Sequence, residues 1–136
     1  MIGILVVAHG RFAHEIVKSG ELIVGLQKDY KTLGLLHGDS IEKFKEDVVQ
    51  AVKDLNNGDG VLVFVDLYGG SPFNAVAMGM HNLSNEVNIE CIIGVNLPMI
   101  IEAFSSRDSY DLQGLKNYIL ELGVHSIKDL REELKG

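Results

Sequence analysis

The sequence contains no tryptophan, one cysteine, two prolines and no long uninterrupted hydrophobic run. The single cysteine, Cys91, excludes an internal disulfide, and its apolar neighbours in VNIECIIGV indicate a small buried thiol. No apolar run reaches the ~20 residues that cross a bilayer, and no basic segment precedes the first apolar run. We therefore expect neither a membrane span nor a signal peptide, and a cytoplasmic location.

The sequence also has few positively charged residues. The 12 Lys and Arg residues are outnumbered by 19 Asp and Glu residues, which gives a formal net charge of -7. Nucleic-acid binding depends on clustered cations that displace the counterions of phosphates, so we expect no nucleic-acid partner. The glycine-rich loop with a following lysine that holds nucleotide phosphates in P-loop proteins is absent as well. Both absences argue against polymer binding and against direct phosphorylation by a nucleotide.

What the sequence does contain is a regular alternation of apolar runs and amphipathic segments. The 136 residues, 46% of them hydrophobic, suit a single domain over 1–136. Segments 11–25 and 41–55 have the period of helices, and further helices follow residue 98. Apolar runs that predict buried strands lie at 2–8, 32–36, 61–65 and 87–95. This pattern predicts an α/β fold with a doubly wound, mainly parallel sheet of flavodoxin-like order 2-1-3-4 and helices on both faces.

Chemically useful residues follow each predicted strand. In an open parallel sheet all strands deliver their carboxyl ends to one edge, where ligands bind. That edge collects the segments AHGR, HGDS, DLYGGSPFN and GVNLPM, at 8–11, 37–40, 66–74 and 94–99. The first and third strands are neighbours in the 2-1-3-4 order, about 4.8 Å apart. We therefore expect His9 and Asp66 to lie within contact distance, although they are far apart in the sequence.

An imidazole held by a carboxylate has one nitrogen free for chemistry. The carboxylate accepts one ring N–H and fixes the tautomer, which leaves the other nitrogen as a nucleophile or a ligand. A neutral imidazole can attack phosphorus without a separate base. From its residue type alone, His9 remains open as a packed core residue, a metal ligand, a base or a nucleophile.

The stretch GGSPFNA at 69–75 predicts a helix start beside this pair. Ser71 stands where an N-cap belongs and Pro72 at the first helical position, and the two preceding glycines let the backbone approach a ligand. The free N–H groups of such a start favour an anion. A purely structural cap remains the alternative for these residues.

Other chemistries that use these residue types fit less well. A serine hydrolase needs the pattern G-x-S-x-G, and Phe73 stands where the second glycine should be. A metal centre needs more ligands than His9 and His14, which a loop-to-helix path does not bring together. A phosphoaspartate receiver matches Asp66 but needs acidic residues after the first strand to bind Mg²⁺, where this chain has His-Gly. A flavodoxin needs a loop rich in Thr and Ser at that same position.

Three motifs occur in the order and at the spacing of a known family: AHG at 8–10, VDLYGGSPFNA at 65–75 and GVNLPMIIE at 94–102. On these residues the chain resembles the mannose-type IIA components of the bacterial phosphoenolpyruvate:sugar phosphotransferase system, a group that includes fructose, sorbose and N-acetylgalactosamine transporters. The resemblance covers nearly the whole chain. It implies a phosphotransferase that works without a cofactor, as a phosphohistidine carrier in sugar transport.

The resemblance also implies partners and residue roles. His9 would accept a phosphoryl group from the phosphocarrier protein HPr and pass it to the IIB component, with the membrane components IIC and IID involved indirectly. Asp66 would orient the His9 ring, and Ser71 would lie closest to the phosphoryl group. The residues expected around the phosphate are Gly70, Ser71, Phe73 and Asn74. The residues expected on the partner surface are Arg11, Leu67, Tyr68 and Met99.

Some positions stay open at this stage. Arg11 is either a surface arginine or a contact to phosphate or partner, and His37 is most simply a turn residue on the same edge. Asn96 and Pro98 are expected to shape their loop and to start a helix. On the same fold, a regulatory or binding module and a phosphotransfer module linked to a dihydroxyacetone kinase are the alternative functions.

The C-terminal residues predict a short strand followed by a charged helix. Members of the family are homodimers that exchange a C-terminal strand. The segment GVHSIK at 123–128 is the one that we expect to be exchanged.

Overall fold

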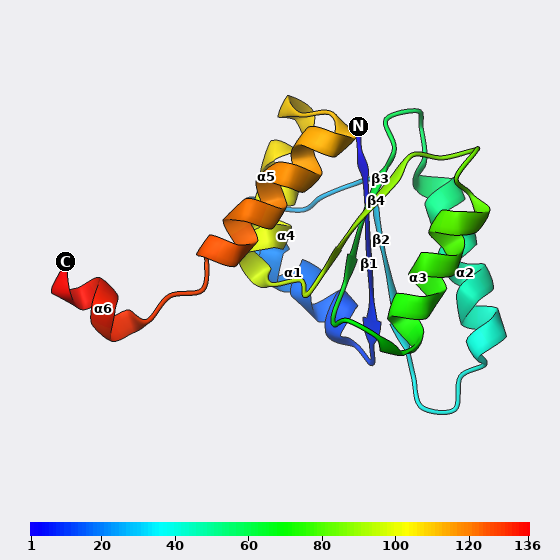
Figure 1. Cartoon of the computed structure of the whole chain (residues 1–136), viewed down its shortest axis with the longest axis horizontal. Coiled ribbons are helices and arrows are strands. Elements are labelled where there is room, and N and C mark those ends of the chain that lie inside the picture. Colours follow the sequence, from blue (N-terminus) through cyan, green and yellow to red (C-terminus); the bar gives the residue numbers. More distant parts are fainter.

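A four-stranded parallel sheet forms the centre of the molecule (Figure 1). The computed structural model describes the whole chain, residues 1–136. The strands lie in the order β2-β1-β3-β4, which confirms the predicted order 2-1-3-4. Their bounds are Gly3–His9 for β1, Tyr30–Leu35 for β2, Val61–Val65 for β3 and Ile89–Ile93 for β4.

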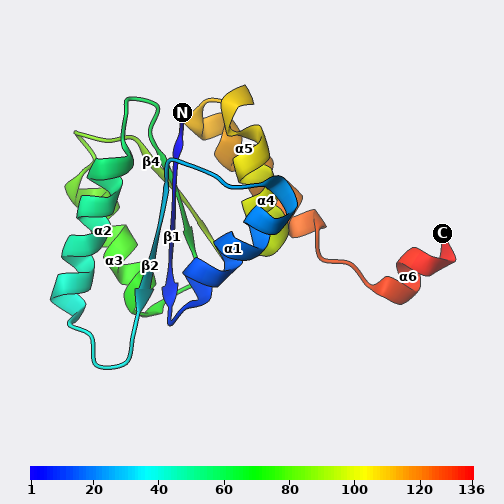
Figure 2. The ribbon, with the colours of Figure 1, turned by 180° about the vertical axis from the view of Figure 1, so that it is seen from behind.

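Helices cover both faces of the sheet, as the two opposite views show (Figures 1 and 2). Helices α2 and α3 pack together on one face, and α1, α4 and α5 pack on the other. Helix α6 stands apart from the body. The bounds are Phe12–Val24 for α1, Ile41–Leu55 for α2, Gly70–Asn82 for α3, Leu97–Ser106 for α4, Leu112–His125 for α5 and Leu130–Lys135 for α6. No helix is both long enough and apolar enough to cross a membrane.

The central strand β1 supplies two separate cores. Ile4 and Val6 join the core under α1, α4 and α5, whereas Leu5 and Val7 join the core under α2 and α3. All four side chains are fully buried. A strand covered on both faces needs apolar residues at every position, which is why this strand appears in the sequence as an uninterrupted apolar run.

Most helix boundaries agree with the sequence signals. Ser40 accepts a hydrogen bond from the Lys43 N–H at the start of α2, and Gly25 ends α1 with a φ of 87°. The exception is α3, where the prediction of Ser71 as N-cap is wrong. This helix begins at Gly70 with Gly69 as N-cap, so Ser71 is its second residue. Both glycines have a positive φ near 84°, a conformation open to glycine, and so the chain turns into the helix earlier than Ser71.

The C-terminal segment also differs from the expectation. The predicted short strand is absent within the single chain, because α5 continues to His125 and residues 126–129 form neither strand nor helix. The predicted charged helix is present as α6, and it projects from the body (Figure 1). An exchange of this segment between two copies stays a prediction.

Arg107 links the starts of two strands at the amino edge of the sheet, the edge opposite to His9. Its guanidinium donates hydrogen bonds to the carbonyls of Ile2 at 3.2 Å, Asp29 at 3.1 Å and Lys28 at 2.6 Å, and it stacks on the Phe104 ring. The residue is only 2% exposed, and burial lowers the pKa of the guanidinium. One side chain thus holds the entry of β1 and the entry of β2 against α4.

Replacing Arg107 with Met should lower the free energy of unfolding by about 3 kcal/mol or more, because the change removes three hydrogen bonds from a buried charged group, including the one to the buried Ile2 carbonyl. Urea denaturation of the variant against the parent protein measures the loss. The exposed Arg131 on α6 provides the control, since Arg131→Met should stay within about 0.5 kcal/mol of the parent. A loss below about 1 kcal/mol for Arg107→Met would contradict the role given to this side chain.

Candidate active site

His9 and Asp66 meet at the carboxyl edge of the sheet, the lower edge in Figure 1. His9 is the last residue of β1, and Asp66 directly follows β3, the neighbouring strand. The ring Nδ1 of His9 donates to Asp66 Oδ2 over 2.7 Å, and the backbone N–H of His9 donates to the same oxygen over 2.9 Å. The predicted contact is therefore present. The carboxylate holds both the backbone and the ring of His9.

Hydrogen-bond donors surround the Asp66 carboxylate and decide its charge. Burial of the carboxylate is the largest single effect and raises its pKa. The hydrogen bonds from the His9 backbone and ring, the charge of His9 and the bond from the Leu67 N–H outweigh burial and hold the pKa of Asp66 below its ordinary value. Asp66 is consequently an ionised acceptor at neutral pH, which fixes the tautomer of His9 with the proton on Nδ1.

The other ring nitrogen of His9, Nε2, faces the first turn of α3. A Cβ atom placed on Gly70 would lie 3.6 Å from Nε2 and 3.5 Å from Cε1, which shows how closely the backbone passes the ring. His9 is half exposed, at 48% of its side-chain surface, whereas Asp66 is 13% exposed. The arrangement presents an oriented nitrogen to solvent beside a helix start.

Two helix starts flank His9, and both lack a side-chain cap. Helix α3 begins next to the ring, and α1 begins three residues after His9. No side chain accepts from their first N–H groups. The other four α-helices are each capped by a side-chain oxygen, from Ser40, Asn96, Asp111 and Asp129. The free N–H groups nearest His9 are thus available to an anion, and the helix dipoles favour one there.

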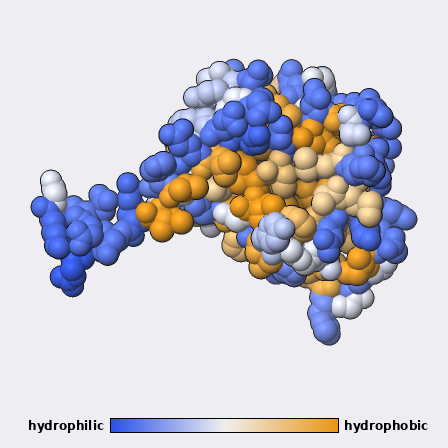
Figure 3. All heavy atoms as spheres, viewed as in Figure 1, coloured by the Kyte–Doolittle hydropathy of each residue, from blue (hydrophilic) through white to orange (hydrophobic).

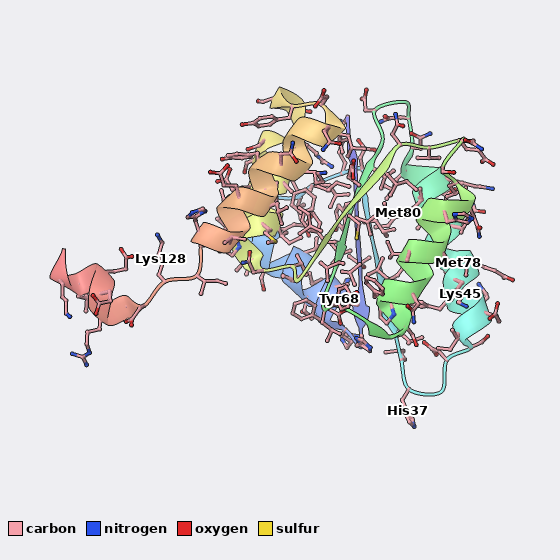
Figure 4. All side chains as sticks on the ribbon, in the orientation of Figure 1. His37, Lys45, Tyr68, Met78, Met80 and Lys128 are labelled. Atoms are coloured by element: carbon pink, nitrogen blue, oxygen red, sulfur yellow. The ribbon has the colours of Figure 1, made fainter.

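The remaining predicted residues of the α3 loop lie around this start. Ser71 and Phe73 are half-buried, and Asn74 is exposed. Tyr68 is 80% exposed, and its ring packs on Phe73 with 4.9 Å between the centroids. Figure 4 shows Tyr68 at the carboxyl edge of the sheet, and Leu67 beside it is also exposed. This loop therefore brings the Gly70 backbone close to His9 and leaves Leu67 and Tyr68 exposed to solvent.

One predicted surface residue is not on the surface. Met99 is 4% exposed and belongs to the core under α1, α4 and α5, so its assignment to the partner surface is wrong. The reason is the phase of α4: this helix turns Met99 toward Gly123 of α5, where an added Cβ would overlap the Met99 side chain. Asn96 does cap α4, as predicted, by accepting from the Met99 N–H.

Arg11 is exposed, and its guanidinium pairs with Glu15 at 3.1 Å. His37 lies at the tip of the β2–α2 loop and points away from the body in Figure 4, so the structure does not bring it to His9. No group of three or more His, Cys, Asp or Glu side chains comes together as a metal site requires. The chemistry at this edge is therefore centred on His9 and Asp66.

Phe12 is a surface feature that the helical pattern did not reveal. Its spacing to Ile16 is that of one apolar helix face, but it is 44% exposed. Together with Ile16, Val95 and Leu97 it lines a shallow groove of about 480 Å³ next to the start of α1. Its place directly after the strand-end motif AHGR is the signal in the sequence that could have identified it.

The sequence pattern of the family described as "PTS system fructose IIA component" matches residues 3–120. The fructose-specific EIIA component of Bacillus subtilis is 29% identical over 99% of this chain and 90% of its own length. The mannose-specific EIIAB component of Escherichia coli K12 is 32% identical over 96% of this chain, which spans 40% of that longer protein.

Solved structures agree with the sequence comparisons. The PTS IIA protein associated with the fucose utilization operon of Streptococcus pneumoniae is 30% identical, with a TM-score of 0.85 over 97% of this chain and 95% of its own. The EIIA component of Streptococcus agalactiae, also 30% identical, has a TM-score of 0.84 over 97% of this chain and 99% of its own. The chain therefore belongs to the family of PTS fructose IIA components, phosphotransfer proteins of the mannose group that act in sugar uptake.

Proposed function

We propose that this chain is a phosphohistidine carrier. His9 accepts a phosphoryl group from phospho-HPr and passes it to the IIB component, in the cytoplasm, while sugar is taken up and phosphorylated. The observation that carries the proposal is the geometry of His9: Asp66 holds its Nδ1 at 2.7 Å, and its Nε2 is left free toward the start of α3.

The transfer needs no proton movement at His9. The lone pair of Nε2 forms a new N–P bond, the N–P bond of the donor breaks, and its electron pair returns to the donor nitrogen. The proton on Nδ1 stays hydrogen-bonded to Asp66, which offsets the positive charge that the ring acquires. Transfer to the IIB component is the same exchange with His9 as the donor.

The charge on the phosphoryl oxygens is the second requirement. Phosphoryl transfer passes through a loose transition state, so catalysis consists mainly of alignment and of stabilising the equatorial oxygens. The N–H groups of Gly70, Ser71 and Phe73 at the uncapped start of α3 are the donors we assign to these oxygens, with the Ser71 hydroxyl and the Asn74 amide beside them. Their place next to Nε2 supports the assignment.

A carrier must expose its nitrogen to two different proteins in turn. Leu67 and Tyr68 are exposed apolar side chains beside the site, and the groove at Phe12 adjoins it on the α1 side. We assign the docking of HPr and of IIB to this shared apolar rim, with Arg11 at its border. The membrane components IIC and IID would be reached only through IIB.

A homodimer that exchanges the C-terminal segment is part of the same proposal. Ile127, Leu130 and Leu134 are each at least 70% exposed, and Leu130 and Leu134 lie one turn apart on α6, so the tail carries an apolar helix face that the body leaves uncovered. Strand β4 is an edge strand with no outer neighbour. Figure 3 shows apolar surface on the face that holds β4, between α3 and α5, and again where the tail leaves.

The first test is chemical labelling. Incubation with phosphoenolpyruvate, enzyme I and HPr should give an acid-labile, base-stable phosphoprotein, and His9→Ala should abolish the label. His14→Ala and His37→Ala serve as matched controls, because both histidines are exposed and neither hydrogen-bonds to Asp66. Label that persists in His9→Ala, or a parent protein that takes no label, would overturn the proposal and favour a binding module instead.

Asp66→Asn should slow phosphorylation of His9 by about 10- to 100-fold, because the amide can donate to Nδ1 and favour the wrong tautomer. Rapid-quench measurement of labelling gives the rate.

The same variant should change the response of stability to acid. The pKa of Asp66 is lowered in the folded state, so the ionised carboxylate stabilises the parent protein at pH values above the ordinary carboxyl pKa. This contribution is lost as the pH falls through the lowered pKa. Urea denaturation between about pH 3 and 7 should thus show a shallower acid loss for Asp66→Asn than for the parent. Parallel curves would contradict the charge state assigned to Asp66.

Substitutions on the apolar face of α6 test whether the tail holds the dimer together. Introducing Leu130→Asp and Leu134→Asp together should shift sedimentation equilibrium from twice the chain mass to a single chain mass, because the face would lose its apolar contacts. Arg131→Asp places a negative charge on the same helix outside that face and should leave the dimer intact. A double variant that remains dimeric would remove the tail from the interface.

A further inference from the structure

Arg11 is the single cation among the segments that form the carboxyl edge of the sheet. The strand ends and loops at 8–11, 35–40, 66–74 and 94–99 contain no other Lys or Arg. A phosphoryl group on His9 would carry up to two negative charges and would lie close to the ionised Asp66. Within these segments, Arg11 is therefore the one positively charged side chain able to balance them.

Local structure does not explain an arginine at this position. Arg11 is the N-cap of α1, where Ser, Thr, Asp and Asn are preferred because their oxygens accept from the helix N–H groups. Arginine has no acceptor, and a cation at a helix N-terminus opposes the helix dipole. A functional role is expected for a residue that destabilises its own helix and lies next to the reacting group.

The present partner of Arg11 holds it only loosely. Nη2 donates to Glu15 Oε1 over 3.1 Å, and this is the guanidinium's sole hydrogen bond. The two side chains are 75% and 56% exposed, and an exposed pair of this kind contributes little stability. A phosphoryl group offers a doubly charged acceptor of matching geometry, which arginine binds through two parallel hydrogen bonds.

The chain also places Arg11 within reach of His9. Two residues apart, their Cα atoms are separated by at most about 7 Å. Gly10 lies between them with a φ of 61°, so the backbone folds back instead of extending, and an added Cβ at Gly10 would meet nothing within 4 Å. The space beside Gly10 is therefore open.

We propose that Arg11 leaves Glu15 and binds the phosphoryl oxygens when His9 is phosphorylated. The proposal rests on the phosphohistidine function given above and deepens it, because it assigns the cation of the site. Glu15 then competes with the phosphoryl group for Arg11. In the unphosphorylated chain the ion pair keeps the guanidinium occupied, and the incoming group releases it.

The experiment measures the phosphoryl equilibrium with HPr, together with the transfer rate, by rapid quench. Arg11→Ala should lower both by about tenfold or more, because its hydrogen bonds to a charged group are lost, and Arg11→Lys should recover part of the loss. Glu15→Gln should raise the equilibrium about twofold, because it removes the competitor. Lys43→Ala is the matched control: Lys43 and Asp47 form the same i,i+4 pair at the start of α2, and its loss should change neither quantity.

A second measurement separates a phosphate contact from a partner contact. The isolated phosphoprotein, free of HPr, should show a changed ³¹P chemical shift and faster hydrolysis in Arg11→Ala than in the parent. Slower transfer with an unchanged shift and hydrolysis rate would place Arg11 on the partner and overturn the proposal, as would transfer equal to the parent. A parent protein that takes no label at His9 would instead overturn the function on which the proposal rests.

Discussion

The site depends on one carboxylate oxygen that accepts two hydrogen bonds from the same histidine. Asp66 Oδ2 receives the backbone N–H of His9 at 2.9 Å and the ring Nδ1–H at 2.7 Å. The two hydrogen bonds can form only because β1 and β3 are parallel neighbours in a fixed register, with Val7 opposite Val65 as the last pair. A slip of one residue would point these side chains to the other face. The two packed cores that fix the register therefore also fix the orientation of the reactive nitrogen.

The same oxygen sets the electrostatics of the edge. Asp66 is partly buried, and its ionised state is favoured by the N–H donors around it. This charge lies on the Nδ1 side of the ring, where it supports a positive imidazole after phosphorylation. It also repels an incoming phosphate, so positive potential has to come from elsewhere. The helix N–H groups on the Nε2 side and the guanidinium of Arg11 are the groups at this edge that provide it.

Much of this arrangement was predictable from the sequence, because it follows from periodicity and from topology. Strands that are buried on both faces need continuous apolar runs, and these runs located the strands in the sequence. Because the carboxyl ends of parallel strands lie at one edge, the contact between His9 and Asp66 could be predicted. Details that depend on a few backbone angles were not predictable. Ser71 resembles an N-cap, yet Gly69 and Gly70 adopt positive φ and start the helix first.

Packing between elements was also beyond the sequence signals. Met99 belongs to a loop motif at the correct edge, but the rotation of α4 against α5 buries it beside Gly123. Phe12 has the helical spacing of the apolar residues of α1, yet it lies at the start of that helix and is 44% exposed. A periodic pattern defines which residues share a face, but the neighbouring element decides how far each face extends into the core.

The distribution of helix caps ties stability to function. Four α-helices begin with a side-chain oxygen that accepts from their own N–H groups, and a missing cap costs about 1 kcal/mol. The two uncapped helices are the ones that begin beside His9. A capping side chain there would occupy the N–H groups that a phosphoryl group needs, so the absence of caps keeps them open. Burial of strands β1 and β3 in the two cores offsets the stability lost at these two uncapped helix starts. The register of the same two strands orients His9 between the starts of α1 and α3.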